Sequence, residues 1–91
     1  IGRRWTGSIL RALCMRAMRF GEISREIPGL SNRLLAERLK ELEDAGLVER
    51  SQDIQDLVYR LTSPGHDLES LFREVDRWNE RWVGADGAEG P

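Results

Sequence analysis

The sequence has little cysteine and no long apolar stretch. Its one cysteine, Cys14, excludes an internal disulfide and fits a reducing, cytoplasmic setting better than a secreted one. The longest apolar run is ALCM at residues 12–15, whereas a membrane-spanning helix needs roughly 20 apolar residues. With 91 residues, of which 40% are hydrophobic and 33% charged, the chain is predicted to form one compact cytoplasmic domain without a membrane segment.

Catalytic and metal-binding patterns are also missing. His66 is the only histidine and has no Cys or His at metal-ligand spacing, so we interpret it as a solvated residue near a helix terminus. There is no Ser-His-Asp set and no glycine-rich phosphate loop, and Glu41 and Glu43 fall on different helix faces. We interpret Cys14 as a core or interface residue, because a reactive thiol needs exposure and a low pKa. The sequence predicts no enzyme, no cofactor and no metal.

Charge is divided unevenly along the chain, although the formal net charge is only -2. Residues 1–40 contain nine Lys or Arg and three Glu, giving +6, whereas residues 41–91 contain five Arg and thirteen acidic residues, giving -8. Such asymmetry points to a polyanionic partner for the first half. The same counts are compatible with an ordinary solvated surface.

Two helices are predicted in the first third of the chain. Residues 4–18 carry an apolar stripe at helical spacing that starts at Trp5, and FGEISREI at 20–27 repeats this spacing. PGLS at 28–31 then predicts a turn, because Pro and Gly interrupt helices. Ser31 at its end is a suitable N-cap for a following helix.

The third predicted helix, residues 32–45, has two different faces. Leu35, Leu39 and Leu42 form one apolar stripe at 100° per residue, and Gly46 favours a helix end. The opposite face carries Arg33, Ala36, Glu37 and Lys40, with Asn32 in the first turn. This pattern is typical of a DNA recognition helix, and also of any surface helix.

A hairpin and a long helix follow. LVERS at 47–51 and LVYRLT at 57–62 predict two strands joined by QDIQD. Thr62 or Ser63 caps the last helix, with Pro64 in its first turn. This helix carries a heptad-like seam that consists of Leu68, Leu71, Phe72, Val75, Trp78 and Trp82. The Gly-rich residues 84–91 are predicted to be a disordered tail, which leaves one domain over residues 1–83.

Three helices, a hairpin and a further helix predict a mainly α fold with a small β-hairpin, a winged helix-turn-helix with a C-terminal dimerisation helix. In this fold the third helix enters the major groove of double-stranded DNA. There Arg33 can bind guanine, Asn32 adenine, and Glu37 the amino group of cytosine. Lys40 is better placed for phosphate, and Ala36 permits close approach.

The seam on the last helix can pack within its own domain or form a dimer interface. We expect a dimer, because the seam has more large side chains than a small three-helix core accepts. The predicted interface residues are Trp5, Leu71, Val75, Trp78 and Trp82. A symmetric homodimer would place two recognition helices about 34 Å apart, which predicts a palindromic operator.

Three segments together carry a family resemblance: RRWTGSILRAL, RFGEISREIPGLSNRLLAERLKELEDAGLVER and YRLTSPGHDLESL. In this order they resemble the HxlR-type winged-helix transcriptional regulators of bacteria over residues 2–82. The resemblance implies a homodimeric DNA-binding regulator without catalytic activity, joined through its terminal helices. It implies a wing at residues 50–60 and a groove-facing role for Ser31, Asn32, Arg33, Ala36, Glu37 and Lys40. Some family members sense oxidants through a cysteine upstream of the Trp-containing motif, whereas Cys14 lies in the first predicted helix.

The predicted wing departs from that family. Family wings often carry Pro and basic residues, whereas Asp53 and Asp56 lie at the tip here and would repel phosphates. Arg50 and Arg60 at the wing base, with Arg25 of the second helix, are the remaining candidate phosphate ligands. The acidic wing leaves an alternative open, a winged-helix protein-interaction module that does not bind DNA.

Overall fold

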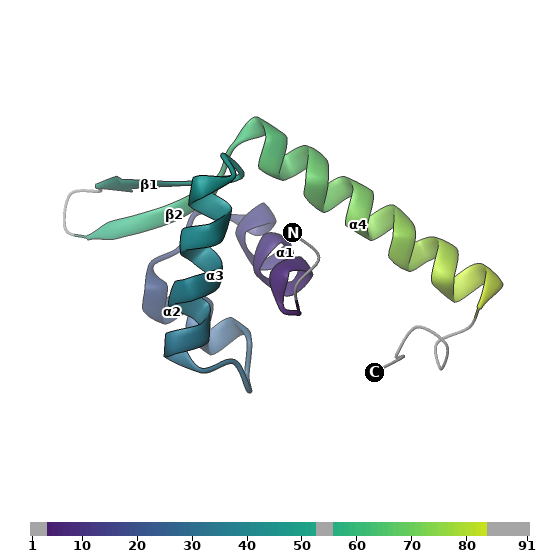
Figure 1. Ribbon diagram of the computed structural model, residues 1–91, viewed down its shortest axis with the longest axis horizontal. Coiled ribbons are helices and arrows are strands. Elements are labelled where there is room, and N and C mark those ends of the chain that lie inside the picture. Colours follow the sequence, from purple (N-terminus) through teal and green to yellow (C-terminus); the bar gives the residue numbers. More distant parts are fainter. Residues whose placement is uncertain (1–3, 53–55, 84–91) are drawn as a thin grey trace.

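The computed structural model describes residues 4–52 and 56–83. Its elements are α1 (Thr6–Met15), α2 (Phe20–Glu26), α3 (Asn32–Asp44), β1 (Val48–Gln52), β2 (Leu57–Leu61) and α4 (Ser63–Trp82). The first three helices gather into one body, the antiparallel hairpin extends from one side of it, and α4 projects from the other side (Figure 1). The predicted order of three helices, a hairpin and a final helix is therefore confirmed. The predicted tail at 84–91 lies outside the described residues.

The first helix is shorter than the predicted span of 4–18. Trp5 precedes it with a left-handed φ of 79°, and the helix ends at Met15 because Arg16 is extended. Met18 instead forms a two-way backbone bridge with Tyr59 of β2, with N···O distances of 3.0 and 2.8 Å. This pairing satisfies the backbone of Met18 while its side chain is buried, so the chain leaves the helix to join the hairpin.

Helices α3 and α4 begin at their predicted caps, and α3 ends at its predicted glycine. Ser31 Oγ accepts a hydrogen bond from Leu34 N at 3.1 Å at the start of α3, and Thr62 Oγ1 accepts one from Gly65 N at 3.1 Å at the start of α4. Gly46 follows α3 with a left-handed φ of 79°, which glycine adopts without steric cost. The boundaries of α3 and α4 therefore follow from local sequence.

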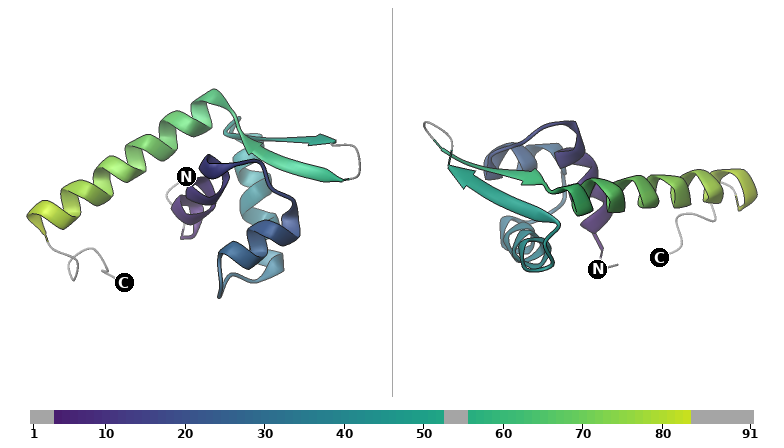
Figure 2. Two further views of the ribbon diagram at one scale, coloured as in Figure 1. Left: turned by 180° about the vertical axis from the view of Figure 1, so that it is seen from behind. Right: turned by 90° about the horizontal axis from the view of Figure 1, so that it is seen from above.

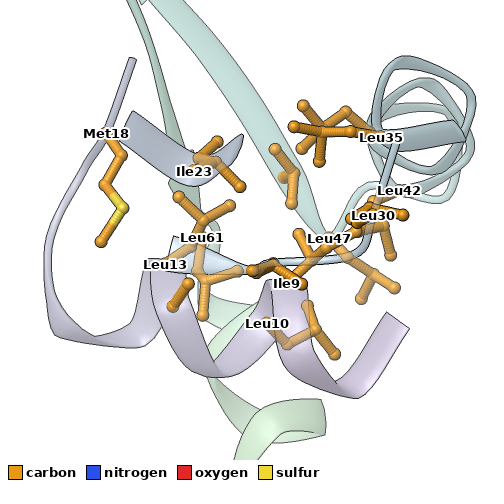
Figure 3. Packing of buried hydrophobic residues seen from close by; sticks show 14 residues of the cluster. Ile9, Leu10, Leu13, Met18, Ile23, Leu30, Leu35, Leu42, Leu47 and Leu61 are labelled. Carbon is orange, nitrogen blue, oxygen red and sulfur yellow. The ribbon is translucent and has the colours of Figure 1, made fainter. Parts of the chain in front are cut away.

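The hydrophobic core lies where α1, α2 and α3 meet the base of the hairpin (Figure 3). Its buried members are Ile9, Leu10, Ala12, Leu13, Met18, Ile23, Ile27, Leu30, Leu35, Leu39, Leu42, Leu47, Val48 and Leu61. Burying one Leu side chain contributes about 1.5–3 kcal/mol. The three leucines of α3 thus fix this helix by packing, and its other face does not have to contribute to the fold.

The seam on α4 is divided between the core and the surface. Leu68 and Phe72 pack against the core, whereas the four predicted interface residues of this helix are between 48% and 68% exposed. Arg11 of α1 pairs with Asp76 of α4 across this junction, with 2.7 Å between Nη2 and Oδ2. Beyond the junction α4 extends away from the rest of the molecule (Figure 2). None of the described helices, α4 included, is long and apolar enough to span a membrane.

Candidate nucleic-acid interface

The exposed face of α3 brings the predicted base-reading residues together. Arg33, Ala36, Glu37 and Lys40 are exposed on the side of the helix opposite its buried leucines, and Asn32 is exposed in the first turn. The Arg33 side chain is 90% exposed and that of Lys40 is 75% exposed. The structure therefore presents two cations, an amide and a carboxylate on one side of a helix that is anchored from behind.

The cations on this face are paired with acids of the same helix. Arg33 Nε lies 3.5 Å from Glu37 Oε2, and Lys40 Nζ lies 3.6 Å from Asp44 Oδ1. In both pairs the base precedes the acid by four residues, which is the weaker orientation in a helix. Exposed pairs of this kind contribute only about 0–1 kcal/mol. Both cations can therefore leave their acidic partner and bind a nucleobase or a phosphate of DNA at little cost in free energy.

Two residues at the start of α3 have structural partners. Ser31 caps the helix, and Asn32 Oδ1 accepts a hydrogen bond from Ser24 Oγ of α2 at 2.9 Å. This bond ties the two helices of the helix-turn-helix together. It leaves the amide nitrogen of Asn32 and the second lone pair of Oδ1 for a base. Arg25 is exposed in the last turn of α2.

Arg38 is a largely buried cation of α3 that was not singled out from the sequence. Its side chain is only 11% exposed, Nη1 lies 3.2 Å from Glu41 Oε2, and its buried Nε has no hydrogen-bond partner among the described atoms. Arg38 lies three residues after Leu35 and four before Leu42, which places it beside the leucine stripe. Its low exposure could therefore have been predicted from the sequence. Arg38 belongs to the packed side of α3.

The wing base supplies two cations. Arg50 Nε lies 3.0 Å from Glu43 Oε2 at the end of α3, which ties the first strand to that helix. Arg60 Nη2 donates to Ser51 Oγ on the paired strand at 3.2 Å. Both arginines are exposed, as phosphate ligands need to be.

An acidic residue of the wing is partly neutralised within the domain. Asp56 Oδ2 lies 3.6 Å from Arg19 Nη1, and Asp56 Oδ1 accepts a hydrogen bond from Leu57 N at 2.9 Å. Arg19 comes within reach because its neighbour Met18 is bridged to the second strand. The pairing reduces the repulsion of phosphate that the sequence predicted for Asp56, while Asp53 lies outside the described residues.

Comparison with known proteins gives the family. A sequence profile of the HxlR-like helix-turn-helix family matches residues 1–86. The chain belongs to this family. The HTH-type transcriptional regulator YodB of Bacillus subtilis is 39% identical to this HxlR-like chain over 85 residues, which cover 90% of this chain and 76% of YodB.

Solved structures agree with this assignment. The reduced form of YodB has a TM-score of 0.83 and 39% identity, over 89% of this HxlR-like chain and 82% of YodB. A possible HxlR family transcriptional factor from Thermoplasma volcanium has a TM-score of 0.78 and 32% identity, over 85% of this chain and 72% of that one. The predicted winged helix-turn-helix is thus confirmed. The family and its named relatives are transcriptional regulators, not enzymes.

One polar cluster lies between α1 and α4 of this HxlR-like protein. Glu69 is buried, pairs with Arg73, and accepts a hydrogen bond from the thiol of Cys14. Partial burial, and then this bond, raise the pKa of Cys14, so its thiolate is scarce at neutral pH. That agrees with the interpretation of Cys14 as a structural residue. Among residues 4–52 and 56–83 no group of three acidic, His or Cys side chains could hold a metal.

Proposed function

We propose that this protein is a homodimeric regulator that binds operator DNA sequence-specifically with α3 in the major groove. The supporting observation is the exposed face of α3, whose base-reading side chains are not used by the core. On it Arg33 binds guanine, Asn32 donates to adenine, and Glu37 accepts from cytosine. Lys40 binds phosphate, and Ala36 lets the helix approach the bases.

The flanking cations position the helix on the DNA backbone. Arg50 and Arg60 bind phosphates beside the wing, and Arg25 binds a phosphate from α2. The N–H groups of the first turn of α3 that the Ser31 cap leaves free can donate to a further phosphate. These contacts carry no base preference but fix the position from which Arg33 reads the groove.

A second copy of the chain covers the exposed seam of α4. Leu71, Val75, Trp78 and Trp82 are large apolar side chains, each about half exposed or more, on a helix that extends beyond its own core. Trp5 differs from them, because it is half-buried and packs against the core of its own domain. A twofold dimer about α4 presents two copies of α3 to successive major grooves, one DNA turn apart.

In vitro selection tests this function. Duplexes bound by the purified protein are enriched from a random-sequence pool and then sequenced. The expected outcome is an inverted repeat whose half-site centres are about one helical turn apart or a multiple of it. An enriched single half-site would contradict the dimer, and a pool without enrichment would contradict sequence-specific binding.

One observation favours a second function, a winged-helix protein-interaction module. Arg33 and Lys40 each have an acidic partner on α3, so this face is less positive than its cations alone suggest. Such a module would bind no duplex even at low salt, because nonspecific affinity for DNA depends on uncompensated basic charge. The same selection separates the two functions.

A further inference from the structure

A cavity of about 500 Å³ lies between α1 and the segment that ends α2. Its lining includes Trp5, Arg11, Met15, Glu26, Ile27 and Pro28 and shares no residue with the exposed face of α3. Sites for small molecules in proteins usually have volumes of about 300–1,000 Å³ and mostly apolar walls with a few polar groups. By size and lining this cavity is suited to a small ligand rather than to DNA.

Among the residues that line the cavity, the charge left unpaired is negative. Arg11 is neutralised by Asp76 of α4, with 2.7 Å between Nη2 and Oδ2. Glu26, the last residue of α2, is exposed and has no ion pair or hydrogen bond with any residue that the structure describes. A cationic group of a ligand can therefore bind Glu26 without displacing an existing partner, whereas an anionic ligand would have to break the pair between Arg11 and Asp76.

The walls suit the apolar body of such a cation. The Trp5 ring can contact a cation, since the Arg4 guanidinium carbon lies 5.3 Å from its centroid, and the ligand must share this ring with Arg4 or displace it. Met15 is 79% exposed, and its flexible thioether can adapt to an aromatic ring. Ile27 and Pro28 form part of the opposite wall, in the segment that leads from α2 towards α3.

We propose that this cavity binds a small organic cation with an aromatic or apolar body. The ammonium group lies beside the Glu26 carboxylate, and the body packs against Trp5, Met15 and Ile27. Occupation bridges α1 and the end of α2, which is the first helix of the helix-turn-helix. The site is thus placed to alter the position of α3 as well as to bind a ligand.

Calorimetric titration of the full chain with benzyltrimethylammonium tests the proposal, with benzylsulfonate as a comparator of similar size and opposite charge. Benzyltrimethylammonium is expected to bind with a dissociation constant on the order of 0.1–1 mM, as its eleven heavy atoms allow. Benzylsulfonate is expected to bind at least about tenfold more weakly. Equal binding of the two compounds, or no binding of the cation at about 10 mM, would overturn the proposal.

Variants locate the site on the molecule. Glu26→Gln keeps the shape and removes the charge, so the affinity for benzyltrimethylammonium should fall at least about tenfold. Met15→Lys puts a cation at the rim at an exposed position and should weaken binding similarly. Glu49→Gln makes the same chemical change as Glu26→Gln on β1, outside the cavity, and should bind like the parent protein. Equal affinities for the Glu26 and Glu49 variants would exclude this cavity.

The titration contains no DNA, so its result is independent of the proposed DNA binding. A protein that binds the cation but selects no duplex would keep this site and lose the proposed function. A protein that selects an inverted repeat but does not bind the cation would keep the proposed DNA-binding function and rule out the cation site.

Discussion

At the scale of single residues, Arg33 is the side chain from which we expect base discrimination. It is 90% exposed on α3 and held only by an exposed pair with Glu37. Arg33→Ala should reduce binding to the selected site by about 1–3 kcal/mol and relax the preference at one base position. The measurement is competition binding against single-base variants of that site. Intact discrimination at every position would show that another residue reads the groove.

Lys40→Ala is the matched control on the same helix face. Because Lys40 is assigned to phosphate, its loss should weaken all duplexes alike and lower the slope of log affinity against log salt by about one. A base-specific loss in this variant would assign Lys40 to the bases instead.

The ionisation of the Glu69 carboxyl makes the free energy of unfolding depend on pH. Burial alone would raise the pKa of Glu69, but hydrogen bonds from Arg73 and Cys14 lower it by more, so its net pKa lies below the ordinary 4.5. A carboxylate with a lowered pKa stabilises the fold above its unfolded pKa, and this contribution is lost as pH falls through the folded value. Glu69→Gln should therefore lower the free energy of unfolding by about 1–2 kcal/mol at neutral pH.

Urea denaturation at neutral pH and at about pH 3 measures this difference. It should shrink at the acidic pH, because protonation of Glu69 in the unfolded parent chain reduces the stability that its carboxylate contributes to the fold. A difference of the same size at both values would mean that Glu69 acts through shape alone.

At the scale of elements, Gly65 sets how closely α4 approaches the loop after α3. A Cβ at Gly65 would lie in severe overlap with the backbone oxygen of Leu47. Glycine inside a helix usually costs about 0.5–1 kcal/mol relative to alanine, but here Gly65→Ala should destabilise the protein by about 3 kcal/mol. Chemical denaturation is the measurement.

Gly21→Ala is the control for that change. Its Cβ would meet only Arg25 Nη1, at 3.7 Å, so this substitution in α2 should stabilise by about 0.5–1 kcal/mol. Equal stabilities for the two variants would contradict the close approach of α4.

The elements differ in how well the sequence predicts them. Helix α3 was predicted at 32–45 and lies at Asn32–Asp44, because the Ser31 cap and Gly46 are local signals. The end of α1 was predicted wrongly. The apolar periodicity runs on to Met18, but its backbone pairs with Tyr59, about forty residues further along, and only the tertiary fold specifies that pairing.

The residues of the candidate site also differ in whether local sequence or the tertiary fold determines their contacts. The face of α3 could be predicted because helical periodicity alone places Arg33 and Lys40 opposite the leucines. The pair between Arg19 and Asp56 could not, since it depends on the bridge that brings the start of α2 beside the wing. The sequence likewise predicts an apolar seam on α4, but only the structure shows that Leu68 and Phe72 belong to the core.

At the scale of the whole molecule, α4, which carries the proposed dimer surface, projects away from the body that contains α3 and the proposed DNA-binding face (Figure 1). Trp78 is 56% exposed and lies in the C-terminal half of α4. Trp78→Glu should therefore give a folded monomer of 10.4 kDa, whereas the parent chain should sediment at twice this mass as the proposed dimer. Analytical ultracentrifugation with circular dichroism measures mass and folding together.

Ser70→Glu is the control, because it adds the same charge at an exposed position of α4 away from the seam. It should remain a dimer. A dimeric Trp78→Glu protein, or a monomeric parent, would contradict the interface on α4.

The charge of the whole molecule sets how the protein should respond to salt. The basic first 40 residues include α3 as far as Lys40, while the acidic remainder includes the last turn of α3, the hairpin and α4. With a net charge of -2, affinity for arbitrary DNA should be weak, and binding should depend on a few local phosphate contacts. Each such contact adds about 0.9 to the slope of log affinity against log salt.

The most direct test of DNA binding through α3 is fluorescence anisotropy with the selected duplex and a random duplex, at about 50 and about 200 mM salt. The protein should bind the selected duplex in preference to the random one and lose affinity steeply at the higher salt. Equal binding to both duplexes, or no binding at the lower salt by a folded dimer, would contradict a sequence-specific regulator and favour the protein-interaction module.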